Sequence, residues 1–441
     1  MRLSLLLLTA ALVLGVAAPP ARYAPIATMV DAVDAARLQQ TDTTLVNFGT
    51  RNDFSEQTST STHGVFAARD WIVGQLRAVA AGTGGRMTVE LDTYTQPKTS
   101  RTPRAVIESS VVATLRGSEP GRIYVMSSHY DDCDGRCTDG AGVAPGADDN
   151  GSGVAAVLEA ARVMASTPFK GTIVFACFDG EELGLWGSGH YARELASRRA
   201  PVLAVLNNDI VGNSTGGDGA HEPGVIRVFS QALPAGTSIE RTNLVGSEND
   251  SPSRELSRFV AETVPVYVPG FTVRQIYRAD RFLRGGDQES FQDAGYAAAI
   301  RFVEAHENFT HQHQDVRMQG GVQYGDLPQY NDWQYLARAT QANVASLATL
   351  ALGPAPPGNV QLLTKHLGYD STLRWKAAAD AESYEIVWRA TDGAQWEDAK
   401  DVGNVTEATV PVSKDDFVLG VRSVDANGLR SPAVYPVAVR D

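Results

Sequence analysis

Five short segments of the sequence carry histidine or carboxylate side chains in arrangements that could bind metal ions. They are His129-Tyr130-Asp131, Gly146 to Gly153 with Asp148 and Asp149, Asp179-Gly180-Glu181-Glu182, Asn207-Asn208-Asp209, and Asn308 to Asp315 with His311 and His313. A pair of divalent ions that activates water needs imidazole and carboxylate ligands, one bridging carboxylate and a separate base. The five segments contain candidates for the ligands, for the bridging carboxylate and for the base. Mixed nitrogen and oxygen donors favour zinc, with cobalt or manganese as substitutes.

Apolar runs with the composition of buried strands precede most of these segments, and helical patterns separate the runs. We therefore expect parallel strands whose carboxyl ends meet at the sheet edge where open α/β folds bind ligands. The predicted fold class is α/β, with a mostly parallel, mixed central sheet flanked by helices. Helices are expected at residues 24–40, 63–81, 151–165, 183–197, 253–264 and 331–352. Strands are expected at residues 87–94, 105–115, 172–178, 201–206, 224–229 and 296–303, and in the run that ends at His129.

Each segment taken alone has a simpler explanation. Asp148 could cap the following helix, His129 could be a hydrogen-bonded core residue, and Asp179 to Glu182 could form a solvated acidic turn. The coincidence of four such strand ends outweighs these explanations. A calcium loop at Asp131 to Gly135 is excluded, because Arg136 stands where the EF-hand spacing requires a third acidic ligand.

Length and charge set the broad class of the protein. The chain has 441 residues, 43% of them apolar, which suffices for two or three domains with a large core. Its net charge of −13 argues against nucleic acid or an anionic membrane as a partner. Residues 1–21 combine a basic start, a short apolar run and small residues, which predicts a signal peptide cleaved after Ala17, Ala18 or Ala21. We therefore expect a secreted or periplasmic protein without a membrane span.

A change of composition divides the chain near residue 353. Residues 22–352 form the expected catalytic domain, and the Gly/Pro-rich residues 353–358 form a stiff linker. Residues 359–441 show short alternating strands, which predicts a small all-β sandwich. These strands are expected at 372–376, 384–389, 408–412 and 417–424. The sandwich resembles a fibronectin type III module in Trp375 and Tyr384 and in the segment 420–428. Nothing in it suggests catalysis, so we expect it to bind a cell surface, a polysaccharide or a polymeric substrate.

Three cysteines bear on the compartment of the protein. Cys133 and Cys137 flank a glycine-containing loop beside the proposed site, and export would permit a disulfide between them. Cys177 lies in an apolar run and is expected to be a buried free thiol. The alternative, in which all three are reduced, stays open from the sequence.

The five segments, in this order, resemble the co-catalytic zinc aminopeptidases of metallopeptidase clan MH, over roughly residues 30–352. The same clan holds glutamate carboxypeptidases and glutaminyl cyclases. The resemblance implies that Asp148 bridges two zinc ions, with a cis peptide bond between it and the next residue. It further implies that His129 and Asp209 complete the ligands of one ion. Glu182 and His311 would complete those of the other.

The resemblance also assigns two residues to catalysis. Glu181 would be the general base, and Asp131 would hold the ring of His129 in its metal-binding tautomer. The family's His-x-x-x-Asp spacing selects His311 rather than His313 as the last ligand.

These implications predict an exported zinc-dependent exopeptidase, an aminopeptidase that hydrolyses N-terminal residues of peptides through a water held between two zinc ions. Arg278, Arg281 and Arg284 would suit a substrate carboxylate, so a carboxypeptidase or dipeptidase is the alternative within the family. Glutaminyl cyclase, which works with one zinc, is a second alternative, and a binding module without catalysis is a third. Tyr277 is a candidate oxyanion donor. Gln288 stands where many relatives have a histidine that is not a ligand.

Overall fold

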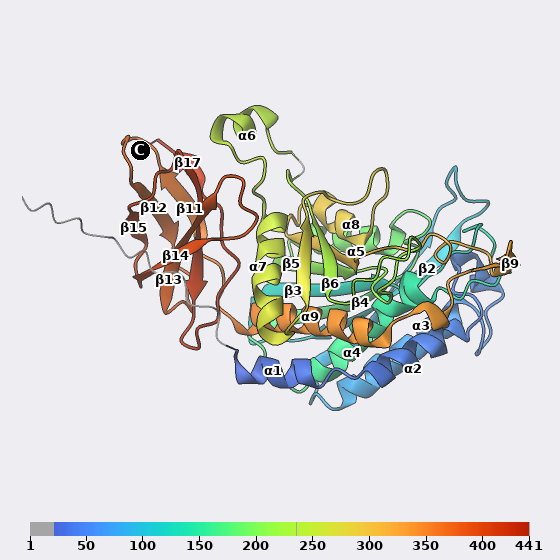
Figure 1. Ribbon diagram of the computed structural model, residues 1–441. Coiled ribbons are helices and arrows are strands. Elements are labelled where there is room, and N and C mark those ends of the chain that lie inside the picture. The colour runs from blue at the N-terminus through green and yellow to red at the C-terminus, as the bar shows by residue number, and fades with distance from the viewer. Residues whose placement is uncertain (1–21, 235, 441) are drawn as a thin grey trace, which may run out of the picture.

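The computed structural model describes residues 22–234 and 236–440, in two parts that pack against each other (Figure 1). The expected signal peptide, residues 1–21, lies outside the described residues. The larger part contains an eight-stranded sheet, and the smaller part, which follows residue 353, consists of short strands. No helix among the described residues is long and apolar enough to cross a membrane.

The eight-stranded sheet has the order β1-β2-β4-β3-β5-β8-β6-β7. Its middle strands β4, β3, β5 and β8 are parallel to one another. β1 and β2 join antiparallel, and β6 pairs antiparallel with β8. The strands are β1 (Met87–Gln96), β2 (Val106–Leu115), β3 (Glu119–His129), β4 (Gly171–Phe178), β5 (Val202–Asn208), β6 (Val225–Ser230), β7 (Thr272–Ile276) and β8 (Ala299–Glu304). The predicted mostly parallel, mixed sheet is confirmed.

Both faces of this sheet are covered by helices. Successive residues of β3 point to opposite faces: Met126 belongs to the larger hydrophobic core and Val125 to a smaller one. The helices of the larger core are α1 (Ala24–Asp31), α2 (Ala35–Val46), α3 (Val65–Ala81), α4 (Gly153–Met164), α7 (Pro252–Tyr267) and α9 (Trp333–Leu352). Those of the smaller core are α5 (Trp186–Ser197) and α8 (Asp287–Asp293). All eight residues of β4 are buried, which explains its continuous apolar run.

Some elements differ from the expectation. The helix expected at 24–40 is two helices, because the side chain of Asp34 accepts the backbone N–H of Ala36 and caps a new helix there. Five short elements of the larger part were not expected, since they are too short to show a period: α6 (Ile239–Val245), β7, α8, β9 (Arg317–Gln319) and β10 (Val322–Tyr324). Three single turns of helix complete this part: η1 (Asp53–Gln57), η2 (Ala147–Ser152) and η3 (Pro328–Tyr330).

The smaller part consists of two sheets around one apolar core. The four-stranded sheet has the order β15-β12-β11-β17, and the three-stranded sheet has the order β14-β13-β16. Their bounds are β11 (Gly358–Leu363), β12 (Ser371–Lys376), β13 (Ser383–Ala390), β14 (Asp398–Gly403), β15 (Glu407–Val410), β16 (Phe417–Val424) and β17 (Val437–Val439). Trp375, Tyr384 and Leu419 pack between the sheets. The predicted all-β sandwich is confirmed as an architecture.

The β-sandwich packs beside α7 of the larger part, and buried ion pairs join the two (Figure 1). Asp250 Oδ1 lies 2.6 Å from Arg389 Nη2 of the sandwich and 3.1 Å from Arg258 Nη1 of α7. All three side chains are almost fully buried. The two parts are therefore held by a specific interface and not only by the linker.

Candidate metal centre

The carboxyl ends of three neighbouring strands bring histidine and carboxylate side chains together. His129 is the last residue of β3, Glu181 and Glu182 follow β4, and Asp209 follows β5. Because β4, β3 and β5 are adjacent and parallel, these ends meet at one edge of the sheet. The ligand atoms of His129, Glu181 and Asp209 all lie within 4.8 Å of one another. The same holds for His129, Glu182 and Asp149.

Asp149, and not Asp148, belongs to this cluster. Asp149 Oδ1 lies 3.3 Å from His129 Nε2, and its Oδ2 lies 3.0 Å from His313 Nε2, so one carboxylate extends between two imidazoles. Asp148 points away, and its Oδ1 accepts the backbone N–H of Gly212 at 2.7 Å. The sequence-based choice of Asp148 is thus corrected, because neighbouring side chains in an irregular turn diverge. The cis peptide bond of this turn joins Asp149 to Asn150, one position after the expected one.

His313, and not His311, completes the cluster. His313 Nε2 lies 3.0 Å from Glu182 Oε1, as well as from Asp149 Oδ2. The ring of His311 instead stacks on Tyr330, with ring centroids 3.7 Å apart. The two histidines lie in a loop of turns after β8, where the spacing of a motif does not fix the direction of a side chain. The sequence-based choice of His311 is therefore corrected as well.

Asp131 connects the ends of β3 and β4. Its two carboxylate oxygens accept the backbone N–H groups of Glu181 at 3.2 Å and Glu182 at 3.0 Å. Its Oδ1 also lies 3.4 Å from His129 Nδ1, the ring nitrogen that faces away from the cluster. One buried carboxylate thus orients the histidine and both glutamates.

The charges of the cluster show what kind of ion it fits. Burial lowers the pKa of His129, but hydrogen bonds with three aspartates raise it well above its ordinary value. The charge of Glu182 raises the pKa of His313, against the effect of burial. Burial raises the pKa of Asp149, but the two histidines lower it overall. A positive charge is therefore favoured on both sides of the Asp149 carboxylate. A buried set of imidazole and carboxylate ligands fits a zinc ion.

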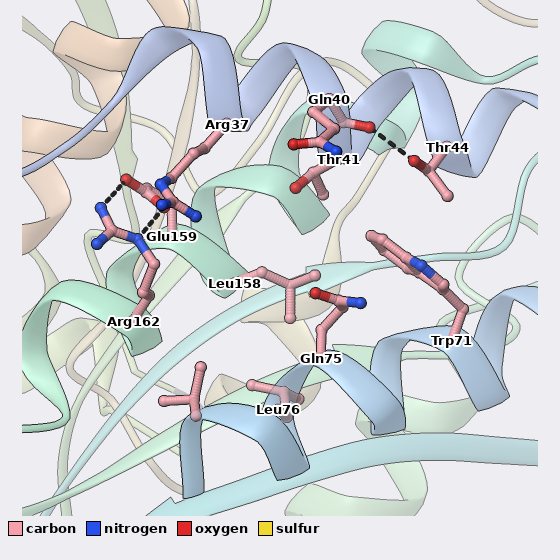
Figure 2. A pocket seen from close by; sticks show the side chains of 11 residues that line it. Arg37, Gln40, Thr41, Thr44, Trp71, Gln75, Leu76, Leu158, Glu159 and Arg162 are labelled. Atoms are coloured by element: carbon pink, nitrogen blue, oxygen red, sulfur yellow. Dashed lines mark hydrogen bonds and ion pairs between the residues drawn. The ribbon is translucent and has the colours of Figure 1, made fainter. Parts of the chain in front are cut away.

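The cluster lines a cleft of about 480 Å³. Four non-glycine residues that line it have φ between 55° and 58°: Leu185, Ile210, Leu283 and His313. Such left-handed backbone is costly for these residues, and it concentrates at functional sites. A separate cavity of about 210 Å³ lies between α2, α3 and α4 (Figure 2). Its one acidic side chain, Glu159, accepts a hydrogen bond from Arg162 at 2.7 Å, so this cavity does not resemble a metal site.

Other expected residues have different positions. The hydroxyl of Tyr277 donates to the carbonyl of Ala394 in the β-sandwich at 2.8 Å. The expectation that Tyr277 is an oxyanion donor is therefore corrected. Arg278 stacks on Phe282, whereas Arg281 and Arg284 line the cleft. A disulfide joins Cys133 to Cys137, and Cys177 is a buried free thiol.

Two residues near the cluster were not identified from the sequence. Arg301, on β8, is buried, and its Nη2 lies 3.0 Å from Asp209 Oδ1. Asp326, after β10, accepts the backbone N–H groups of Asp148 and Asp149. Of the two, only Arg301 could have been noticed in the sequence, since it is a charged residue among the apolar residues of a strand.

Comparisons with known proteins show the family of this chain. The model of peptidase family M28 matches residues 110–319. A probable zinc metalloprotease of Leptosphaeria maculans is 46% identical, over 95% of this chain and 98% of that protein. One of Pyrenophora teres f. teres is 45% identical, over 92% of this chain and 86% of that protein.

Solved structures share the fold at lower identity. The LapA aminopeptidase of Legionella pneumophila is 20% identical, with a TM-score of 0.53, over 77% of this chain and 78% of that chain. A glutaminyl cyclase of Porphyromonas gingivalis is 18% identical, with a TM-score of 0.50, over 72% of this chain and 98% of that chain. The cluster at the strand ends and the close relatives point the same way. The chain therefore belongs to peptidase family M28, and it is a zinc metallopeptidase.

Proposed function

We propose that this metallopeptidase is an aminopeptidase that uses two zinc ions. The observation that carries the proposal is the position of the Asp149 carboxylate, with one oxygen toward His129 and the other toward His313. A carboxylate with a different imidazole at each oxygen has the form of a bridging ligand. His129 and Asp209 would hold one ion with Asp149, and Glu182 and His313 would hold the other.

The two ions would polarise the peptide carbonyl and lower the pKa of the attacking water. Glu181 would take the proton of that water and deliver it to the leaving amine. Burial raises the pKa of Glu181 well above its ordinary value, which suits a group that accepts and returns a proton. Asp131 would keep Glu181 in place, because it accepts the backbone N–H of that residue.

Two observations support an exopeptidase that acts at the N-terminus. The cleft contains the carboxylates of Asp149, Glu182 and Asp209, and a free α-amine would bind beside them, at one of the ions that they would hold. The solved LapA aminopeptidase shares the fold. Metal analysis of the full-length protein together with hydrolysis of aminoacyl nitroanilides tests the proposal. We expect two zinc ions per chain and hydrolysis that an N-acetyl group on the substrate abolishes. Equal rates on blocked and free substrates would reject the aminopeptidase.

Glutaminyl cyclase is the second candidate, because a solved glutaminyl cyclase shares the fold. One zinc per chain, together with pyroglutamate formed from an N-terminal glutamine, would support it. Export to the periplasm or the medium is also part of the proposal. It is supported by the character of residues 1–21 and by the disulfide between Cys133 and Cys137. The fibronectin type III assignment of the β-sandwich and its binding of a surface or polymer stay predictions.

A further inference from the structure

Arginine side chains form one wall of the cleft. Arg281 and Arg284 come from the loop before α8, and Arg301 comes from β8. Arg101, from the connection between β1 and β2, lines the same cleft. We call these four residues the arginine wall. They lie in one cleft with Asp149, Glu182 and Asp209 of the metal centre.

The arginine wall has fewer carboxylate partners than arginines. Glu307 is shared by Arg281 at 3.1 Å, by Arg284 at 3.4 Å and by Arg227 at 2.7 Å. Asp280 is likewise shared by Arg281 and Arg301. Two carboxylates, Asp280 and Glu307, are thus shared by four arginines: three of the arginine wall (Arg281, Arg284 and Arg301) and Arg227. Asp209 also contacts Arg301, but it belongs to the metal centre.

Several guanidinium donors of the wall remain available. Arg301 is 1% exposed, and its Nε has no hydrogen-bond partner among the described residues. The side chain of Arg284 is 39% exposed, and its contact with Glu307 is long. No described residue hydrogen-bonds the guanidinium of Arg101. A guanidinium has five N–H donors in a fork that matches a carboxylate, so this excess favours an anionic group in the cleft.

The acidic residue of the cleft outside the metal centre does not cancel this excess. Burial, together with the charge of Asp280, raises the pKa of Glu289 to about 7. Glu289 therefore carries only part of a negative charge near neutral pH. The carboxylates of the metal centre would be compensated by the ions they hold. Positive charge thus remains on the wall that a substrate would contact.

We propose that the arginine wall, through Arg101 and Arg284, binds a carboxylate of the substrate beside the cleaved bond. The substrate class is a short peptide that carries this carboxylate in one of two places. It is either the C-terminal carboxylate of a dipeptide or the side chain of an acidic second residue. The inference rests on the proposed function, since it places the bound peptide in the same cleft.

Three matched dipeptides test the proposal with the zinc-loaded, full-length protein. Ala-Gln-amide has neither carboxylate, Ala-Gln has only the terminal one, and Ala-Glu-amide has only the side-chain one. We expect kcat/KM for one of the two acids to exceed that of the neutral peptide about 10-fold or more, as one charge-assisted bidentate contact allows. The acid with the higher kcat/KM shows whether the wall binds the terminal carboxylate or the side-chain carboxylate.

Variants assign the preference to the wall. Arg101→Gln and Arg284→Gln should each lower the ratio of kcat/KM for the acid to that for the amide. Arg198→Gln removes the arginine that directly follows α5, is 57% exposed and pairs with Glu194, and it should leave the ratio as in the wild type. A wild-type ratio near one would overturn the proposal. A ratio that survives in the double variant of Arg101 and Arg284 would also overturn it, because the metal centre would then bind the carboxylate.

A binding measurement separates this proposal from the proposed function. If none of the peptides is hydrolysed, the aminopeptidase proposal fails while the wall can still be tested. Calorimetry would then compare three blocked probes on the wild type and on Arg284→Gln: N-acetylglutamine amide without a carboxylate, N-acetylglutamine with only the terminal one, and N-acetylglutamate α-amide with only the side-chain one. Tighter binding of one of the two acids than of the neutral amide, on the wild type alone, would support the arginine wall, and equal binding of all three to the wild type would reject it.

Discussion

The carboxylate of Asp326 accepts the backbone N–H of Asp149 at 2.7 Å, although 177 positions separate the two residues. It also accepts the backbone N–H of Asp148, with both of its oxygens at 2.9 Å. Asp326 thus fixes the turn from which the Asp149 side chain reaches both histidines. The position of the Asp149 carboxylate therefore depends on a loop that follows β10, far from the strand ends in sequence.

Replacing Asp326 should weaken metal binding without unfolding the protein. In Asp326→Asn, one acceptor oxygen becomes an amide N–H group that faces the N–H donors of the turn. We expect zinc affinity to fall about 10- to 100-fold, as for other groups that orient metal ligands. Competition with a chromogenic chelator measures this. Asp332→Asn is the matched control, because Asp332 caps α9 and asparagine also caps helices. Equal affinity of both variants would contradict the role of Asp326.

The two histidines after β8 provide a matched pair of variants. His313 contacts Asp149 and Glu182, whereas His311 stacks on Tyr330. We expect His313→Ala to lose one zinc ion per chain and most of its activity, and His311→Ala to keep both ions. Metal content by mass spectrometry decides between them. The reverse result would restore the assignment that the motif spacing suggested.

Glu181→Gln should separate metal binding from proton transfer. Glutamine keeps the size of the side chain, and the ligand atoms of Glu182 and Asp149 are untouched. We expect the zinc content of the wild type and a kcat lower by about 100- to 10,000-fold, the usual contribution of a general base. Turnover at the wild-type rate would falsify the role of Glu181.

The sequence predicted the part of the site that regular structure positions. His129 ends β3, and Glu182 and Asp209 follow β4 and β5. The ends of such parallel neighbouring strands lie at one edge of the sheet, independently of the loops. The sheet was predicted in the same way. β4 is buried on both faces, and its sequence is therefore a continuous apolar run. These residues could therefore be placed from strand pattern alone.

The residues that lie in irregular backbone could not be placed in this way. Asp148 and Asp149 are adjacent in a turn with non-helical dihedral angles, and His313 has a φ of 55°. In such segments the direction of a side chain depends on tertiary contacts, here the hydrogen bonds from the turn to Asp326. Asp326 itself lies in a polar loop with no period. Its role follows only from the folded chain.

A buried carboxyl group outside the metal centre should make stability depend on pH. Burial, with the charges of Asp179 and Asp131, raises the pKa of Glu108 to about 10. The folded state then keeps a proton that the unfolded state releases above the ordinary pKa of glutamate. The contribution of Glu108 to stability is thus complete at low pH and is lost as pH rises toward about 10, by about 1.4 kcal/mol per pH unit.

Glu108→Gln removes this proton and should flatten the decline. We expect the variant to lose less stability than the wild type between pH 6 and pH 9, measured by urea unfolding at both values. Glu90→Gln, at an exposed position of β1, is the control and should follow the wild type. Parallel curves for the wild type and Glu108→Gln would show that the carboxyl group is ionised in the folded protein.

The interface with the β-sandwich should contribute to the stability of the whole chain. Arg389 of the sandwich lies 2.6 Å from Asp250, and both side chains are 1% exposed. Arg389→Met would leave Asp250 with one of its two arginines, and breaking a buried pair costs about 3 kcal/mol. We expect a clearly lower Tm, measured by calorimetry. Lys400→Met, at an exposed position of β14 in the same sandwich, should leave Tm unchanged. If both variants melt like the wild type, the sandwich is a tethered module, and its removal would not destabilise the catalytic part.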